Sequence, residues 1–336
     1  MPRADDPPAG PDWGLVATVK APPEKVMAFV AHHLSLGAAR IWLYFDDPED
    51  AAFDLVAAIP QVTATRCGDD YWSRLRARPE RHQNRQSRNA QAAYKACLLP
   101  WIGHVDVDEF LWPARPGDTV AGLLGAVPPD QLTLRMEPFE AMHDPSLPDD
   151  IFTARLFRGP LKQRVAHLRE PILGSYAGML PEGHLSHTNG KSFFRTGIPG
   201  LSPRLHGAFL NGERLSGPAF DRRLRLLHFH AQDREGWLKA LPFRLTRGAY
   251  QYHAGMQAHL AGAGPEEIAF FYDRTQRLTS ELAALLAGEG RLIEADLGLR
   301  DRIAALARSL PGTASGQRRD PPRQGDDRPQ GDKNPR

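Results

Sequence analysis

The chain has 336 residues, a length that suits one large domain or two modest ones. Hydrophobic residues make up 41% of it and charged residues 24%, which excludes a chain that is disordered throughout. The formal net charge of +2 is too balanced for a protein that coats nucleic acid, so we expect no nucleic-acid partner.

Cysteine usage and apolar runs bear on the compartment. Cys67 and Cys97 are the two cysteines of the sequence, too few for a disulfide framework, which favours a reducing compartment. The N-terminal residues lack the apolar core of a signal peptide, and no run of about 18 apolar residues could span a membrane. We therefore expect a cytoplasmic protein without a transmembrane segment.

The first third of the chain alternates strands with helices. Residues 1–12 are predicted to be a disordered leader. Three strands and two helices are then predicted, in the order 15–19, 24–36, 39–45, 49–59 and 62–66. This order with short connections predicts an α/β fold of the Rossmann-like type, with a mostly parallel sheet flanked by helices.

The rest of the chain adds a basic helix, further strands and a helical end. The basic helix is predicted over 71–99. One strand is predicted to begin at residue 101, and three more are predicted over 132–136, 151–157 and 224–229. Helical patterns follow over 234–260, 265–288 and 291–310. We expect one α/β domain over 13–232, a C-terminal helical part over 233–310 packed on it, and a disordered tail over 311–336.

The most informative stretch is the acidic run Asp106-Val107-Asp108-Glu109. An apolar run that starts at Trp101 leads into it, which places the acids at the carboxyl end of a buried strand. Three carboxylates there repel one another, and their burial without a compensating charge is unfavourable. A divalent cation removes this problem, because Asp106 and Asp108 share one side of an extended chain and can reach one hard ion.

A plainer alternative stays open for this run. Acid-x-acid patterns are common at exposed turns and in the first turn of a helix, where solvent satisfies the carboxylates. The flanking Trp101 and Trp112 favour the cation site, because a solvated turn needs no aromatic walls.

The segment WIGHVDVDEFLWP, residues 101–113, resembles a signature of known enzymes. It is similar to the W-x-x-x-D-x-D-E-F motif of metal-dependent glycosyltransferases with the GT-A fold, closest to the bacterial group of glycosyltransferase family 2. The resemblance runs in order over roughly residues 14–240 and includes the segments HHLSLG, IWLYFDD, GKSFFR and HF. One departure lies in the loop KAPPE, residues 20–24, where the family usually carries Asn-Glu.

The resemblance implies a nucleotide-sugar site with a Mn²⁺ or Mg²⁺ ion. Asp106 and Asp108 would hold the ion against the diphosphate of the donor, and His228 would approach it from a later strand. Asp46, at the end of the second strand, would meet the base or ribose. A bound cation suits this chemistry because the departing nucleoside diphosphate develops negative charge.

Other basic residues are weaker candidates. Lys20 and Lys191 would contact the nucleotide sugar, and His230 is the alternative to His228. His187 and His206 are expected to be structural. An arginine-rich face within 81–88 would gather an anionic donor or acceptor, or else is a solvated helix face.

An inverting transfer also needs a carboxylate that deprotonates the acceptor hydroxyl. Glu137, Glu140 and Asp144 are the candidates, in a loop-like stretch after the strand at 132–136. Glu182 is a further option, and spacing does not choose among the four.

The resemblance therefore implies an inverting glycosyltransferase that moves a sugar from a UDP- or GDP-sugar to a glycan or other hydroxyl acceptor. Arginines of the tail are compatible with peripheral contact to a membrane surface. Two alternatives stay open. One is a metal-dependent phosphohydrolase that uses the same acids to activate water, and the other is a non-catalytic relative that binds nucleotide sugars.

Overall fold

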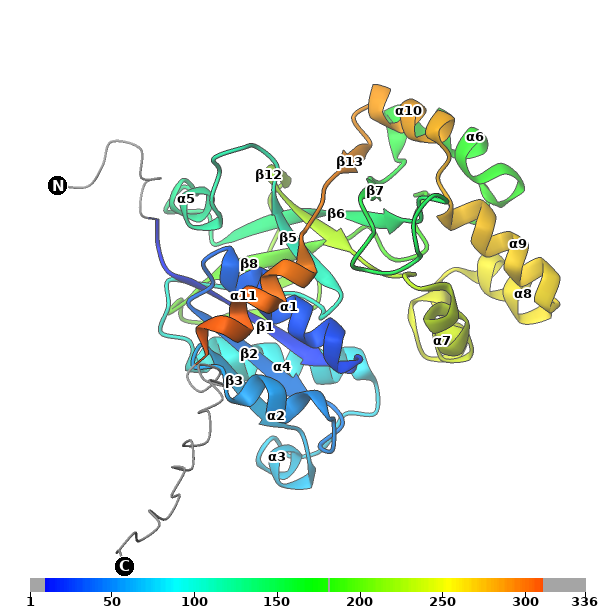
Figure 1. The fold of residues 1–336 in the computed structure, drawn as a ribbon. Helices are drawn as coiled ribbons and strands as arrows, with labels where there is room; N and C mark the ends of the chain where they lie inside the picture. The colour runs from blue at the N-terminus through cyan, green and yellow to red at the C-terminus, as the bar shows by residue number, and fades with distance from the viewer. Residues whose placement is uncertain (1–9, 181, 311–336) are drawn as a thin grey trace, which may run out of the picture.

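A computed structural model describes residues 10–180 and 182–310 of the chain (Figure 1). Most of the predicted leader and the whole predicted tail lie outside the described residues. The described chain forms a mixed sheet flanked by helices, with a further group of helices gathered at one end of the sheet (Figure 1).

The first five elements follow the predicted order. They are β1 (Trp13–Val19), α1 (Pro23–Ser35), β2 (Arg40–Phe45), α2 (Ala52–Ala57) and β3 (Val62–Arg66). The three strands pair in parallel, so the predicted α/β class with a Rossmann-like sheet is confirmed. Side chains along a strand alternate between the two faces of the sheet, and apolar side chains of β1 pack into a core on each face. Leu15 and Ala17 belong to the core that includes α1, whereas Val16 belongs to the core of the opposite face.

The sheet gains its other strands from later parts of the chain. They are β4 (Trp101–His104), β5 (Glu109–Pro113), β6 (Thr133–Met142), β7 (Leu156–Arg158), β8 (Lys191–Arg195), β12 (Phe220–His228) and β13 (Leu292–Glu294). The main order is β13-β7-β6-β8-β4-β1-β2-β3, and β12 pairs with β5 and β6. β4 is parallel to β1, while β8 is antiparallel to both β4 and β6. The parallel half of the sheet is thus joined to a mostly antiparallel half, in which β12 runs parallel to β6.

A small sheet and a short helix lie outside the main sheet. A three-stranded sheet contains β9 (Leu201–Arg204), β10 (Gly207–Leu210) and β11 (Glu213–Arg214). The short helix α5 (Val120–Gly125) begins at Thr119, whose hydroxyl accepts a hydrogen bond from the Gly122 N–H and so caps the helix.

Two predictions for the middle of the chain are wrong. The basic segment forms two helices, α3 (Asp69–Arg74) and α4 (His82–Ala96). The break between them contains Arg76, at φ +80°, and Pro79, and neither position continues a right-handed helix. The strand predicted at 132–136 continues as β6 to Met142. Glu137 and Glu140 therefore lie on a strand and not in a loop.

Two further predictions need correction. The strand predicted at 151–157 is confined to β7, because the Asp150 carboxylate accepts the N–H groups of Phe152 and Thr153 and folds this stretch locally. In the segment predicted as a helix over 291–310, residues of β13 pair antiparallel with β7. The helix α11 (Leu299–Ser309) begins only after this strand.

A group of helices lies at one end of the sheet (Figure 1). These helices share a second hydrophobic core. They are the 3₁₀ helices η1 (Gln163–Leu168), η2 (Gly174–Tyr176) and η3 (Ala249–Tyr252), and α6 (Arg169–Leu173), α7 (Arg234–Thr246), α8 (Ala254–Gly262), α9 (Pro265–Gln276) and α10 (Ser280–Gly288). Trp237, Tyr250 and Phe271 are buried there. α11 instead packs against α1. Within the described residues, no helix has the length and apolar character needed to cross a membrane.

Candidate functional site

Three predicted site residues stand at the carboxyl ends of adjacent parallel strands. Lys20 follows β1, Asp46 follows β2, and Asp106 comes shortly after β4. β1 lies between the other two strands. The Asp46 N–H donates to the Val19 carbonyl at 3.1 Å, which joins the carboxyl ends of β1 and β2. The fold therefore brings together residues that are far apart in the sequence, at the edge where open α/β sheets bind ligands.

The acidic run forms a tight turn between β4 and β5, and the extended chain expected from the sequence is wrong. The Glu109 N–H donates to the Asp106 carbonyl at 3.0 Å, and the Asp106 N–H donates to the Glu109 carboxylate at 2.7 Å. These two bonds reverse the chain between the two residues. As a result Asp106 shares a site with Glu109 and not with Asp108.

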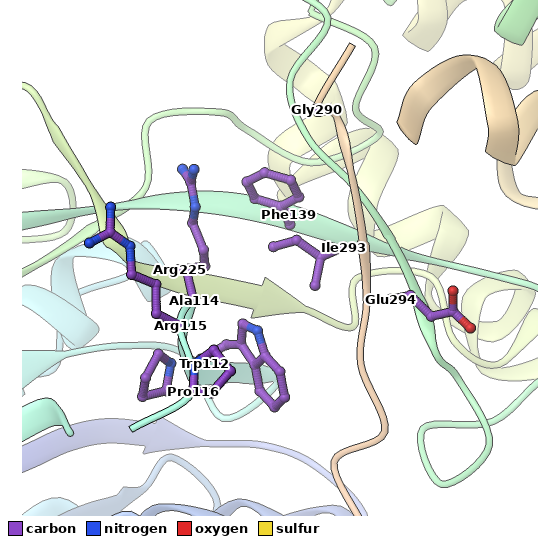
Figure 2. A pocket seen from close by; sticks show the side chains of 10 residues that line it. Trp112, Ala114, Arg115, Pro116, Phe139, Arg225, Gly290, Ile293 and Glu294 are labelled. Carbon is purple, nitrogen blue, oxygen red and sulfur yellow. The ribbon is translucent and has the colours of Figure 1, made fainter. Parts of the chain in front are cut away.

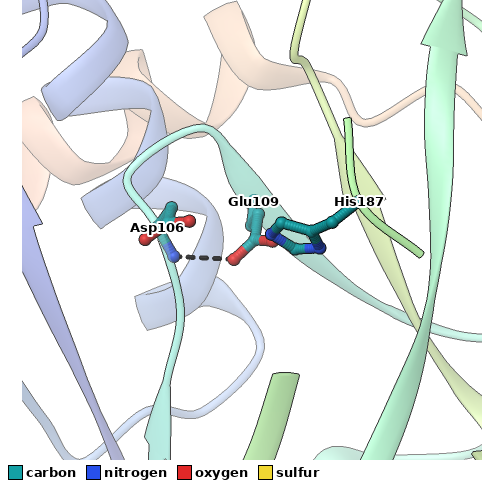
Figure 3. Close-up of side chains that lie close together, drawn as sticks. All are labelled: Asp106, Glu109 and His187. Carbon is teal, nitrogen blue, oxygen red and sulfur yellow. Dashed lines mark hydrogen bonds between the residues drawn. The ribbon is translucent and has the colours of Figure 1, made fainter. Parts of the chain in front are cut away.

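A third side chain completes this cluster. Possible metal-ligand atoms of Asp106, Glu109 and His187 all lie within 4.8 Å of one another (Figure 3). Glu109 is fully buried, and neither its Oε1 nor Nδ1 of His187 has a hydrogen-bond partner among the described residues. Buried polar atoms without partners are uncommon in folded proteins. Carboxylate oxygens and an imidazole nitrogen are suitable metal ligands, so these three residues could hold a metal ion.

Asp108 and His228, both predicted to be metal ligands, pair with each other. His228 ends β12 opposite Glu109, and its Nε2 lies 3.5 Å from Oδ2 of Asp108. Burial alone would lower the pKa of His228, but the charge of Asp108 and its hydrogen bond outweigh burial and raise the pKa to about 9. Asp108 and His228 thus contact each other, and neither is among the three residues whose possible ligand atoms converge.

Lys191 places a positive charge inside the cluster. It begins β8, and the antiparallel pairing of β8 with β4 brings its side chain to the carboxyl end of β4. Its Nζ donates to Oδ2 of Asp106 at 2.8 Å and lies 3.7 Å from Oε2 of Glu109. The side chain is fully buried, so the ammonium is held by these carboxylates and not by bulk solvent.

Burial and this ammonium shift the two carboxylates in opposite directions. Burial raises the pKa of Glu109 to about 7, and the attraction of Lys191 only partly offsets it. Burial also acts to raise the pKa of Asp106, but the charge and hydrogen bond of Lys191 outweigh it and hold that pKa well below its usual range. Asp106 and Lys191 are therefore an ion pair at neutral pH.

Helix α4 contacts both predicted aspartates through consecutive residues. Arg85 donates to the two carboxylate oxygens of Asp46 at 2.7 and 2.8 Å, and Arg78 donates to the same carboxylate at 3.1 Å. Gln86 donates to Oδ1 of Asp106 at 2.7 Å. Part of the arginine-rich face is thus used inside the protein, and a nucleotide contact by Asp46 would compete with Arg85.

Glu140 explains how His187 reaches the cluster. Glu140 is fully buried on β6 and accepts the N–H groups of Leu185 at 3.0 Å and Ser186 at 2.9 Å. It also pairs with the buried Arg158 of β7 at 3.4 Å. These bonds fix the chain immediately before His187. Glu140, a candidate base, therefore holds the segment that carries His187.

Two of the other candidate bases lie elsewhere. Glu137 pairs with Arg225, and it also pairs with Arg291 at 3.2 Å. Asp144 follows β6 and accepts the N–H and the hydroxyl of Ser146 at 2.9 and 2.7 Å. Among the described residues, neither carboxylate bonds to a member of the cluster, so the structure does not select one of the candidates as the base.

Sequence reasoning assigns neither Glu109 nor His187 to the metal. A period of two on an extended chain selects Asp106 with Asp108, and only the observed turn brings Glu109 into that place. His187 is expected to be structural, like His206, and the two rings lie 4.0 Å apart in an edge-to-face contact. One signal in the sequence could have pointed to His187: it lies shortly before Lys191, which is itself a predicted ligand contact.

A cavity of about 540 Å³ lies on another part of the sheet (Figure 2). Its lining includes Trp112, Phe139 and Arg225. Trp112 stands three residues after Glu109 on β5, and side chains alternate along a strand, so the two point to opposite faces of the sheet. The cavity is therefore separate from the acidic cluster.

Comparisons with known proteins add little to this geometry. No family model matches the chain, and no curated protein matches it either. Among solved structures, the chain is similar to the crystal structure of HddC from Yersinia pseudotuberculosis, with 11% sequence identity and a TM-score of 0.37. The match covers 69% of this chain and 99% of that chain. A likeness at this level carries no argument about function.

Proposed function

We propose that this chain is a metal-dependent glycosyltransferase of the GT-A type, similar to bacterial family 2 enzymes. It would move a sugar, with inversion, from a nucleotide-sugar donor to a hydroxyl acceptor. One observation carries the proposal: Asp106, Glu109 and His187 converge at the carboxyl edge of a parallel sheet. Open α/β sheets bind their ligands at this edge, and the D-x-D-E-F resemblance supports the same class of enzyme.

In this proposal the metal ion is held by the convergent oxygen and nitrogen ligands of Asp106, Glu109 and His187. The mixed ligand set favours Mn²⁺ over Mg²⁺, because Mg²⁺ prefers oxygen ligands alone. A bound divalent ion stabilises the negative charge that develops on the departing nucleoside diphosphate.

The chain's own basic groups then bind the donor. The exposed Lys20 and the buried Lys191 neutralise phosphate oxygens, and Asp46 faces the nucleoside from the end of β2. The protonated His228 adds a fixed positive charge beside the cluster. These groups orient the donor at the sheet edge and favour an anionic ligand there.

The test is a thermal-shift and calorimetric screen of UDP-, GDP- and CMP-sugars, with and without Mn²⁺. The wild type is compared with Asp106→Asn, and with Asp130→Asn as the same substitution at an exposed acid outside the cluster. We expect one class of nucleotide sugar to raise the Tm only with metal, in the wild type and in Asp130→Asn but not in Asp106→Asn.

Two other outcomes would contradict the proposal. Metal binding without a response to any nucleotide sugar would favour the phosphohydrolase. Absence of metal binding, both alone and with every nucleotide sugar, would refute both enzymes and leave the acids as a structural turn. A positive screen is followed by an assay for release of the nucleoside diphosphate in the presence of hydroxyl acceptors.

A further inference from the structure

Lys191 stands where a divalent ion would need to bind. Its Nζ lies 2.8 Å from Oδ2 of Asp106 and 3.7 Å from Oε2 of Glu109. The possible ligand atoms of the cluster lie within 4.8 Å of one another, so an ion among them is a close neighbour of this ammonium. Two positive charges this close in a buried site repel each other strongly.

The partners of the carboxylate oxygens show which contact must change. Both oxygens of Asp106 are engaged, since Oδ2 accepts from Lys191 and Oδ1 accepts from Gln86. Oε1 of Glu109 and Nδ1 of His187 have no partner among the described residues. An incoming ion therefore finds two ligand atoms without a partner, whereas at Asp106 it meets an oxygen that already accepts a hydrogen bond from the Lys191 ammonium.

Lysine is suited to give up such a bond. Its ammonium sits on a flexible four-carbon stem, so Nζ of Lys191 is able to leave Asp106 while the backbone of β8 stays in place. Gln86 carries no charge, and an ion has no electrostatic reason to expel it. Of the two groups that donate to the Asp106 carboxylate, the ion repels Lys191 by its full charge.

We propose that Lys191 is an internal counter-ion, which a divalent metal ion displaces from Asp106 and which the diphosphate of the donor then receives. The second half of this inference rests on the proposed function, whereas the first half concerns the metal alone. Because each ligand removes an obstacle to the other, metal and nucleoside diphosphate bind with positive coupling, and each raises the affinity for the other by the same factor.

The test replaces Lys191 by methionine, which keeps an apolar stem and removes the charge. Mn²⁺ is titrated calorimetrically into the wild type and Lys191→Met, first alone and then with saturating UDP. Without UDP we expect the variant to bind Mn²⁺ about tenfold more tightly or better, within the usual range of coupling between sites. UDP should raise the Mn²⁺ affinity of the wild type by a larger factor than that of the variant.

Two further variants keep the test decisive. Lys95→Met is the same substitution at an exposed position of α4 and should leave Mn²⁺ binding unchanged. If circular dichroism shows that Lys191→Met does not fold, Lys191→Gln replaces it, since glutamine retains a donor for Asp106. The expected direction is the same.

The possible failures are distinguishable. Equal or weaker Mn²⁺ binding by the Lys191 variant overturns the exchange, and the proposed function stands if the wild type still binds UDP with Mn²⁺. Tighter Mn²⁺ binding by the variant, with no UDP binding by either protein, supports the exchange and refutes the proposed function. Absence of Mn²⁺ binding in the wild type and both Lys191 variants overturns the exchange.

Discussion

Replacing His32 by glutamine isolates the effect of one buried imidazole on the pH dependence of stability. His32 lies on α1 and is fully buried; its Nε2 donates to the Leu111 carbonyl at 2.8 Å, and its Nδ1 has no partner among the described residues. Burial lowers the pKa of His32 from 6.5 to about 3. Below pH 6.5 the unfolded chain therefore binds a proton that the folded protein excludes, and stability falls as the pH falls.

The magnitude follows from this difference in pKa. At pH 5 the proton on the unfolded histidine lowers the free energy of unfolding by about 2 kcal/mol, against about 0.2 kcal/mol at pH 7. Glutamine retains a donor for the Leu111 carbonyl but does not titrate. The loss of stability between pH 7 and pH 5 should therefore be about 2 kcal/mol smaller in His32→Gln than in the wild type, whatever the substitution does at pH 7.

The assay is urea unfolding at pH 7 and pH 5, followed by circular dichroism. His167→Gln, on η1, makes the same substitution at an exposed histidine and serves as the matched control. Equal losses of stability in the wild type and in His32→Gln would refute the conclusion that this imidazole is buried in its neutral form.

Two further predictions concern the support of the site. Glu140→Ala leaves the guanidinium of Arg158 buried without its counter-charge and should lower the free energy of unfolding by about 3–5 kcal/mol. The double variant Glu140→Leu/Arg158→Met should lose less, and a larger loss would contradict this account. Gly190→Ala, at φ +67° with an added Cβ 2.1 Å from the Met136 carbonyl oxygen, should lose more than Gly197→Ala, at φ +69° with open space. Gly197→Ala should lose about 1–2 kcal/mol, and equal losses in urea unfolding would show that the backbone of β6 yields at little cost.

The parallel half of the fold is predictable from the sequence because its signals are local. Each strand there is a short apolar run, and α1 begins at Pro23 and ends before Gly37, whose φ is +92°. β3 has the predicted bounds, 62–66. The antiparallel half is not predictable in this way. β8 inserts between β4 and β6, which both precede it in the chain, and no periodicity encodes that pairing.

The candidate site is predictable to the same extent as the fold: residues with a local signal are found, and residues placed by long-range contacts are not. Asp106 follows from an acidic run at the end of an apolar strand, and the strand topology places Asp46 and Lys20 at the same edge. Glu109, and not Asp108, is the acid whose ligand atoms converge with those of Asp106. This depends on a turn closed by backbone and side-chain hydrogen bonds, which residue spacing does not encode. His187 depends on the buried support of its segment by Glu140, a long-range contact that the sequence does not show.

The requirement that buried acids be compensated is visible in the sequence, but the compensating groups are not. Sequence reasoning meets that requirement with a divalent ion, whereas the protein itself supplies Lys191 and the protonated His228 from later strands. In formal charge, the three acids of the turn exceed these two cations by one. A divalent ion therefore adds charge to a site that is already close to neutral, which disfavours binding of the metal alone. An anionic diphosphate that arrives with the ion restores the balance, so the affinity for the metal depends on the donor as well as on the ligand atoms.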